Sequence, residues 1–299
     1  MPDTKRFGLQ RKIIANMTSA GWRHSPHVSF LYEADVTRMM ETLKEINAGR
    51  GIGEAITFNT AMLKIIAEGV KACPKMNGHI RYSERLARGS VTTYESVDVT
   101  MPVMVDRDTM MTLNVRGMEK KSMTEIRDAV ADLIRRARNT DLRQVMYEVA
   151  MHDTLKELKR FRIVKVLGRL IGLLLDGGAK LLPSREEKRR FDAIPASERL
   201  TWRDLEQGTI TVSNPGTLFK RWNGECVLLE LVPPQIAAIA VNMVRDRAVV
   251  GKDGAVRAAK TAKLTIVFDH RALDGADLVP FIRRVDRIIS TPEIFKGLA

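Results

Sequence analysis

Segments with a period of two alternate with segments of helical period along this chain, and that alternation limits the fold more than any other feature. The strand-like runs lie at 27–36, 77–82, 88–105, 208–216, 227–250 and 263–275. The helical patterns lie at 11–20, 35–49, 57–73, 122–139 and 274–290. Several strand-like runs follow one another across short turns. The order predicts an α/β (α+β) fold, with a mixed sheet and helices on one face rather than a doubly wound parallel sheet.

The helix starts and stops carry their own signals. Ser122 and Glu125 have the spacing of a capping box at the start of 122–139. Pro74 ends the preceding pattern at 57–73, because a residue before proline avoids helical backbone angles. These signals support the helical interpretation of both segments.

Length and charge limit the number of domains and the class of partner. The chain has 299 residues, of which 44% are hydrophobic, so a single domain over 1–299 with a real core is expected. The net charge of +13 favours an acidic or phosphate-rich partner. Cys73 and Cys226 are the two cysteines and form neither a metal-ligand spacing nor a disulfide framework, so we expect no metal and a reducing, cytoplasmic location. No apolar run is long enough to span a bilayer.

Residues 140–200 differ from the rest and are expected to form a helical insertion within the domain. Between 155 and 190 there are eleven Lys or Arg and four Asp or Glu, a net charge of +7. Apolar residues fill the other face of the helical repeat, which predicts a basic amphipathic helix. Its function could be contact with an anionic membrane surface, which would make the protein peripheral, contact with an acidic partner, or a lid over an acyl chain. Packing on the domain's own surface is the alternative. We expect no nucleic-acid partner, because no aromatic residues are interleaved with the charge.

His270 is the first candidate for chemistry. It follows the apolar run "LTIVF", and Asp274 and Gly275 come four and five residues later. A histidine titrates near neutrality and suits general base catalysis, with Asp274 placed to orient the imidazole. A turn at Asp-Gly with a hydrogen-bonded histidine beside it explains the same residues, and the spacing alone does not exclude it.

Ser213 is the second candidate, at the end of the alternating run "TITVS" and before the turn "NPG". A hydroxyl at this position can donate a hydrogen bond to a developing oxyanion. It can equally cap the turn. The sequence alone does not place Ser213 beside His270.

Taken together, the motifs resemble those of the dihydrolipoamide acyltransferases, the core components of 2-oxoacid dehydrogenase complexes. "FDHRALDGADLVPFI" is similar to their C-terminal Asp-His-Arg-x-x-Asp-Gly signature, and "GTITVSNPG" to an upstream Gly-Thr-x-Thr-x-Ser-Asn-x-Gly segment. "SPHVSFLYEADVTRMMETL" and "ACPKMNGHI" resemble the family's N-terminal segments. The resemblance covers about 11–139 and 200–297.

The resemblance implies a chloramphenicol acetyltransferase-like fold, assembled as a homotrimer or a larger cage, with the active site in a channel between subunits. It implies that His270 is the general base toward a thiol, that Ser213 stabilises the oxyanion and that Asp274 supports the histidine. Coenzyme A is then the acyl-carrying substrate. Asp269 and Arg271 are expected to hold the end of the strand as an ion pair, while His27 either approaches the channel or packs the strand.

Three departures from the family pattern affect the expected function. The family's lipoyl and subunit-binding domains have no counterpart here, so a lipoyl group is expected from another chain, on separate lipoyl-domain or dehydrogenase subunits. The segment "VDRDTMMTLNVRG" at 105–117 differs from the family's Gly-Leu-Val-Val-Pro-Val type, and 140–200 is inserted. The expected function is acyl transfer between coenzyme A and a dihydrolipoamide-type thiol. O- or N-acyl transfer to a small alcohol or amine, and a non-catalytic trimeric scaffold, remain as alternatives.

Overall fold

A computed structural model describes residues 7–105, 110–159, 163, 167–168, 184–217, 222 and 224–299. The chain divides into two compact units. The larger unit comprises Met17–Pro102, Val115–Val130 and Gly208–Ala299, and the smaller comprises Met1–Asn16, Val103–Asn114 and Ala131–Gln207.

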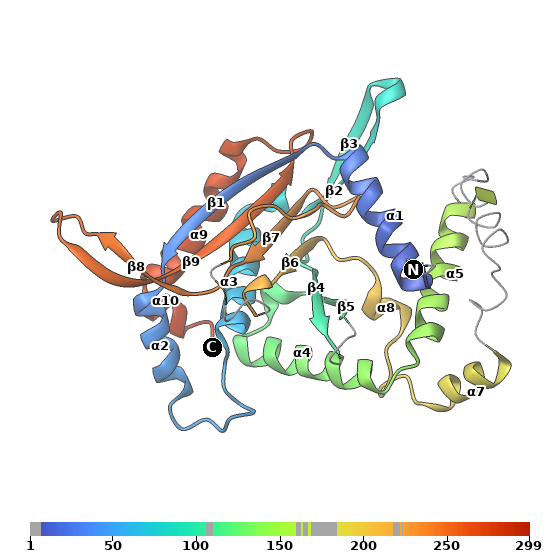
Figure 1. Cartoon of the computed structure of the whole chain (residues 1–299), viewed down its shortest axis with the longest axis horizontal. Helices are drawn as coiled ribbons and strands as arrows, with labels where there is room; N and C mark the ends of the chain where they lie inside the picture. The colour runs from blue at the N-terminus through green and yellow to red at the C-terminus, as the bar shows by residue number, and fades with distance from the viewer. Residues whose placement is uncertain are drawn as a thin grey trace, which may run out of the picture. The chain divides into compact units, whose positions relative to one another are not determined.

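A seven-stranded mixed sheet is the main element, with the strand order β1-β9-β7-β6-β4-β5 and with β8 also paired to β9 (Figure 1). Its strands are β1 (His27–Asp35), β4 (Val99–Met104), β5 (Met110–Val115), β6 (Ile210–Ser213), β7 (Ala237–Val241), β8 (Arg245–Val250) and β9 (Val256–Asp269). β9 is antiparallel to β1, β7 and β8, whereas β6 is parallel to β4 and β7. The predicted mixed sheet is therefore confirmed.

Helices of the larger unit cover one face of this sheet. They are α2 (Thr37–Asn47), α3 (Phe58–Ala72), α9 (Val279–Ser290) and α10 (Pro292–Lys296). α3 and α9 pack closely because Gly69 has no side chain: a Cβ there would lie 2.7 Å from the Phe281 ring. Thr57 caps α3 by accepting a hydrogen bond from Thr60 N at 3.1 Å.

The opposite face of the sheet is covered by an extended segment, 225–232, and by the end of α1 (Leu9–His24). Leu231 packs on Ala238 of β7 and Val267 of β9. Gly21 lies directly against the Leu231 carbonyl, so a side chain there would clash. The sequence predicted continuous β structure over 227–250, but the first part of that range lies across the sheet rather than within it.

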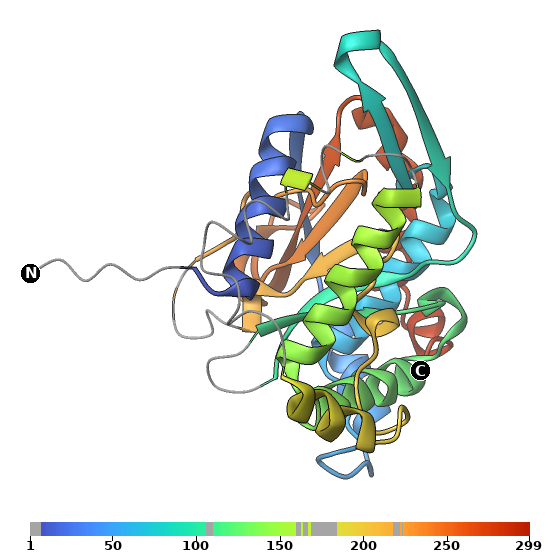
Figure 2. The same cartoon turned by 90° about the vertical axis from the view of Figure 1, so that its right-hand side faces the viewer.

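Two short strands form a hairpin outside the main sheet. β2 (Gly78–Ser83) and β3 (Arg88–Thr93) form a separate hairpin joined by the turn η2 (Glu84–Leu86). Figure 2 shows this hairpin extending away from the other strands of the larger unit. The remaining 3₁₀ turns are η1 (Pro74–Met76), η3 (Met118–Lys120), η5 (Pro215–Thr217) and η6 (Gly275–Leu278).

The predicted capping box at the start of α4 (Met123–Arg138) is confirmed. Ser122 N donates to Glu125 Oε2 at 2.7 Å, and Glu125 N donates to Ser122 Oγ at 3.2 Å. The two reciprocal bonds satisfy backbone donors that a helix start leaves without partners.

The predicted insertion at 140–200 holds the helices α5 (Leu142–Lys159) and α7 (Arg185–Ala193), and α8 (Trp202–Leu205) follows it. α5 begins well before the predicted start at 155, and most of the predicted basic helix at 155–190 lies outside the described residues. Ser184 and Glu187 form a second capping box, which the sequence analysis missed. Trp202 stacks on His152 with a centroid separation of 3.9 Å, so α8 packs on α5.

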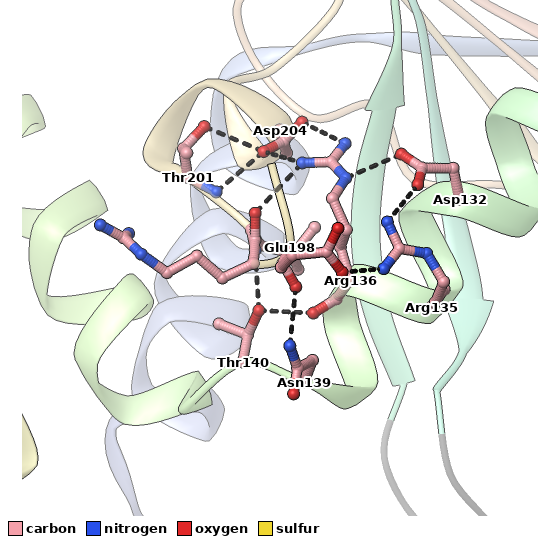
Figure 3. Close-up of polar contacts among 10 residues, drawn as sticks. Asp132, Arg135, Arg136, Asn139, Thr140, Glu198, Thr201 and Asp204 are labelled. Carbon is pink, nitrogen blue, oxygen red and sulfur yellow. Dashed lines mark hydrogen bonds and ion pairs between the residues drawn. The ribbon is translucent and has the colours of Figure 1, made fainter. Parts of the chain in front are cut away.

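A charge cluster joins the end of α4 to the chain that returns from the insertion (Figure 3). Arg136 donates two hydrogen bonds to the Asp204 carboxylate, at 2.9 and 3.0 Å, and one to Asp132 at 2.8 Å. Thr140 Oγ1 accepts from Leu200 N at 2.7 Å. The chain thus leaves α4 and returns to it at the same place within the smaller unit.

Burial disfavours ionisation of Asp204, but hydrogen bonds from Arg136 and Thr201 outweigh it and hold the pKa of this carboxyl below its usual value. A carboxylate with a depressed folded-state pKa stabilises the fold above its unfolded pKa of about 3.9, and the contribution is lost as the pH falls through the folded value.

We expect Asp204→Asn to lower the free energy of unfolding by about 1–3 kcal/mol at pH 7, because Arg136 loses its bidentate partner. Denaturant unfolding at several pH values measures this, and the difference from wild type should shrink below about pH 4. Asp192→Asn is the matched control, since Asp192 is half-exposed and lies 4.0 Å from Arg199. Equal losses in both variants, or a difference independent of pH, would contradict this account.

Candidate functional site

His270 lies immediately beyond the buried end of β9. Asp269 N donates to Ile236 O at 2.9 Å, and His270 N donates to Pro26 O at 3.0 Å, so both neighbouring segments hold the backbone here. The imidazole packs edge-on against Phe268, with centroids 5.9 Å apart. Its side chain is 52% exposed. The sheet therefore fixes the backbone of His270 while its ring remains accessible.

Asp274 lies beside that ring, as the sequence spacing suggested. Its Oδ1 is 3.4 Å from Nδ1 of His270, and the carboxylate is 78% exposed. Asp274 N donates to Asp277 Oδ2 at 2.9 Å, which shapes the turn η6 that follows. With Nδ1 directed toward the carboxylate, Nε2 is the ring nitrogen on the far side, available to accept a proton.

Gly275, the residue after Asp274, has neither a positive φ angle nor a close neighbour that would require glycine. Glycine is frequent in turns because it adopts positive φ angles, but the positive-φ glycines of the described chain are Gly49, Gly117 and Gly254. A Cβ at Gly275 would meet no atom within 4 Å. Neither strain nor close packing therefore demands glycine at this turn.

Asp269 and Arg271, on either side of His270, form the predicted ion pair. Arg271 Nε donates to Asp269 Oδ1 at 2.9 Å and Nη2 donates to Oδ2 at 2.6 Å. The backbone N of Arg271 donates to the same carboxylate at 3.0 Å. Asp269 is fully buried, so this bidentate pairing offsets the cost of removing its charge from water. The Arg271 guanidinium also lies 5.4 Å from the Tyr82 ring centroid.

His27 packs the strand. Its Nδ1 is 2.5 Å from Ser25 O, and its Nε2 accepts a hydrogen bond from Leu231 N at 2.8 Å. Trp22 stacks on the ring with centroids 5.0 Å apart. Both ring nitrogens are thus engaged by the backbone, and of the two roles left open for His27 the structure supports packing.

Ser213 closes β6 and is half-buried. The turn after it, η5, lies against the end of β7: a Cβ on Gly216 would be 2.8 Å from Met243 N. Glycine is therefore required where the turn approaches the neighbouring backbone. Because the turn directly follows Ser213, this close approach fixes where β6 ends.

Asn242 supports the same end of the sheet and was missed in the sequence. Its side chain is buried, donates to Thr265 Oγ1 at 3.0 Å and accepts from Cys226 N at 2.8 Å. It thereby joins β7, β9 and the extended segment 225–232. In the sequence, the sign of this structural role is that Asn242 is the single polar residue inside the apolar run "IAAIAVNMV".

Strand register places Ser213 and His270 at opposite ends of the sheet. Ser213 pairs with Ala240, and Ala240 pairs with Thr265 on β9. His270 comes five residues after Thr265, which is about 16 Å along the strand direction. The two residues also lie on strands separated by β7. One chain therefore brings Asp274 to His270 but does not bring Ser213 to it.

The described part of the chain holds neither a candidate metal site nor a candidate membrane span. No group of three or more His, Cys, Asp or Glu side chains lies in metal-binding geometry there. No helix in that part is both long and apolar enough to cross a membrane.

Comparison with known proteins identifies the family. A sequence model of the 2-oxoacid dehydrogenases acyltransferase (catalytic domain) family matches residues 3–148 and 188–295. The dihydrolipoyllysine-residue acetyltransferase component of the pyruvate dehydrogenase complex of Staphylococcus epidermidis is 22% identical over 294 residues, covering 97% of this chain and 52% of that protein. The chain thus spans about half the length of the curated relatives it matches.

Solved structures share the fold. The cubic core of a pyruvate dehydrogenase multienzyme complex superposes with a TM-score of 0.67 at 15% identity, covering 99% of this chain and 94% of the other. The dihydrolipoamide acetyltransferase of Azotobacter vinelandii, studied for the role of a serine, a histidine and an asparagine in its catalytic mechanism, gives the same TM-score, identity and coverage. The family match covers well over half of the sequence, and the chain belongs to the 2-oxoacid dehydrogenase acyltransferase family, matching its catalytic domain.

Proposed function

We propose that this chain is a coenzyme A-dependent acyltransferase that moves an acyl group between coenzyme A and a dihydrolipoamide-type thiol. The observation that carries the proposal is the placement of His270: its backbone is fixed at the buried end of β9, its ring is half-exposed, and Nδ1 lies 3.4 Å from Asp274. Family membership supports acyl transfer as the reaction class. The catalytic residues are His270, Ser213 and Asp274.

The chemistry needs a base, because a thiol is a poor nucleophile until it loses its proton. Nε2 of His270 takes the proton from the attacking thiol, and the thiolate adds to the thioester carbonyl. The tetrahedral intermediate carries a negative oxygen, which the Ser213 hydroxyl stabilises by donating a hydrogen bond. The intermediate then breaks its original carbon–sulfur bond, and the departing thiolate recovers the proton from the imidazolium.

This mechanism needs two copies of the chain, because Ser213 and His270 of one copy lie at opposite ends of the sheet. The Ser213 end of one copy must meet the His270 end of the next. Such a contact joins two different surfaces, so repeating it generates a ring if the rotation closes. We propose a homotrimer as this ring, and assembly into a larger cage is compatible with the cubic core formed by a relative.

The Azotobacter enzyme has an asparagine four residues after its histidine, which is the spacing of Asp274 from His270. Either side chain offers an oxygen that accepts a hydrogen bond from Nδ1–H. We therefore propose that Asp274 orients the imidazole, and that a neutral amide can replace it in part.

The partners follow from the reaction. Coenzyme A is the acyl-carrying substrate, and the lipoyl group is supplied by another chain, on a lipoyl-domain or dehydrogenase subunit. The chain's charge of +13 suits both, because the coenzyme carries phosphates and acidic partners are attracted at long range.

His270→Ala is expected to lower kcat for acetyl transfer from acetyl-coenzyme A to dihydrolipoamide by about 10²–10⁴-fold, with little change in KM. Ser213→Ala should lose about 10²–10³-fold, and Asp274→Asn less than Asp274→Ala. Steady-state kinetics measures kcat and KM for these four variants. His24→Ala, at the exposed end of α1, is the matched control and should behave as wild type.

Equal activity of His270→Ala and wild type would contradict the proposed base. Transfer to small alcohols or amines but not to dihydrolipoamide would leave the base intact and replace the thiol acceptor with the O- or N-acyl alternative. A wild-type protein inactive toward thiols, alcohols and amines would favour the scaffold.

We also propose that the chain is one catalytic domain and that the insertion is an accessory to it. The family match passes over 149–187, and Arg143 Nη2 on α5, shortly before this segment, lies 3.2 Å from Glu187 Oε1 at its end. Whether 155–190 contacts an anionic membrane surface stays a prediction.

Replacing 149–187 by a short Gly/Ser linker is expected to leave acyl transfer within about twofold of wild type, because the excised chain is absent from the family pattern. Steady-state kinetics measures the acyl-transfer activity, and co-sedimentation with anionic vesicles measures membrane binding of the same two proteins. Loss of transfer would contradict an accessory role. Equal vesicle binding by both proteins, or binding by neither, would contradict the membrane contact.

A further inference from the structure

The hairpin of β2 and β3 has one apolar and one polar face. Ile80 pairs with Val91, and Tyr82 pairs with Gly89, which puts Ile80, Tyr82 and Val91 on the same face. The other face carries His79, Arg81, Ser83, Arg88, Ser90 and Thr92. This alternation is typical of a sheet that buries its apolar face. In the single chain, however, Tyr82 is 46% and Val91 43% exposed.

An exposed apolar face is a particular problem for this hairpin. Two strands alone are marginally stable in water, and a third element against the apolar face is usually needed. Every residue of β3 is exposed. Figures 1 and 2 both show the hairpin extending away from the remaining strands of the larger unit. Its apolar face therefore needs a partner outside the chain's own sheet.

The base of the hairpin adjoins the His270 end of the sheet. Ile80 N donates to Pro234 O at 2.8 Å, next to the residues that pair with the end of β9. Tyr82 lies across Gly89, where a Cβ would be 2.8 Å from the ring, and faces the guanidinium of Arg271. The apolar face thus begins beside the residue that follows His270.

We propose that the apolar face of this hairpin packs against the second copy of the chain that supplies Ser213 to His270. The inference rests on the proposed function, since the two-copy site is what places another copy beside His270. For its Ser213 to reach the same thioester as His270, that copy must lie within a few ångströms of the His270 loop. Tyr82 is in contact with this loop through Arg271, so the same copy covers the hairpin face.

Two neighbouring residues of β3 provide a matched test, because successive residues of a strand point to opposite faces. Val91→Asp puts a charge on the apolar face, and Ser90→Asp puts the same charge on the polar face, opposite Arg81. Both sites are exposed in the single chain, so both variants should fold, which circular dichroism checks. Neither residue belongs to the catalytic machinery.

Sedimentation equilibrium and transfer activity are measured across a range of protein concentrations. Val91→Asp should raise the dissociation constant of the assembly at least about tenfold. Its activity per chain should fall at low concentration and recover at high concentration, with KM for coenzyme A unchanged. Ser90→Asp should assemble and react as wild type.

Unchanged assembly of Val91→Asp would overturn the proposal. If that variant assembles normally but shows a raised KM for a lipoyl-domain substrate, the face binds the acyl donor instead of a second copy. His270→Ala separates this outcome from failure of the proposed function: it should assemble normally and be inactive. A His270→Ala protein as active as wild type would refute the catalytic role while leaving the interface measurement valid.

Discussion

The buried ion pair between Asp269 and Arg271 is the interaction on which the rest of the site depends. A fully buried Asp269 carboxylate without a partner would strongly destabilise the fold. The guanidinium and the backbone N–H of Arg271 offset that cost only when all three donors point at the two carboxylate oxygens. Because the two residues flank His270, that geometry also fixes the direction in which the chain leaves β9. Positioning of the imidazole is therefore a consequence of how the end of a buried strand is made stable.

The second constraint is the strand register. β9 pairs with β1 from Thr261 to Asp269 and with β7 from Leu264 to Phe268, so a shift by one residue would move its buried side chains to the wrong face. The same register keeps Ser213 level with Thr265, away from His270. In the proposed mechanism, the base and the oxyanion donor of one copy thus lie at two ends of its sheet, and assembly of copies becomes part of the chemistry. The hairpin beside Arg271, with its exposed apolar face, fits that requirement.

Local patterns in the sequence predicted much of the fold, because caps and periodicity are short-range properties. Ser122 and Glu125 make the backbone contacts of the predicted capping box. The pairing of Asp269 with Arg271 was expected from the family resemblance, and the structure shows it. What the sequence could not show depends on distant partners. The course of 225–232 across the sheet is set by contacts with His27 and Thr265, and the need for glycine at 216 comes from Met243.

The central claim is that each active site combines His270 of one copy with Ser213 of another, and joint expression of two inactive variants tests it most directly. His270→Ala and Ser213→Ala chains, carrying different tags and purified together through both, contain sites in which the intact histidine meets the intact serine. In the proposed homotrimer, every assembly that holds both chains has one site of three with both residues intact, so about a third of the wild-type activity should return. Activity no higher than that of either variant alone would contradict a site shared between copies.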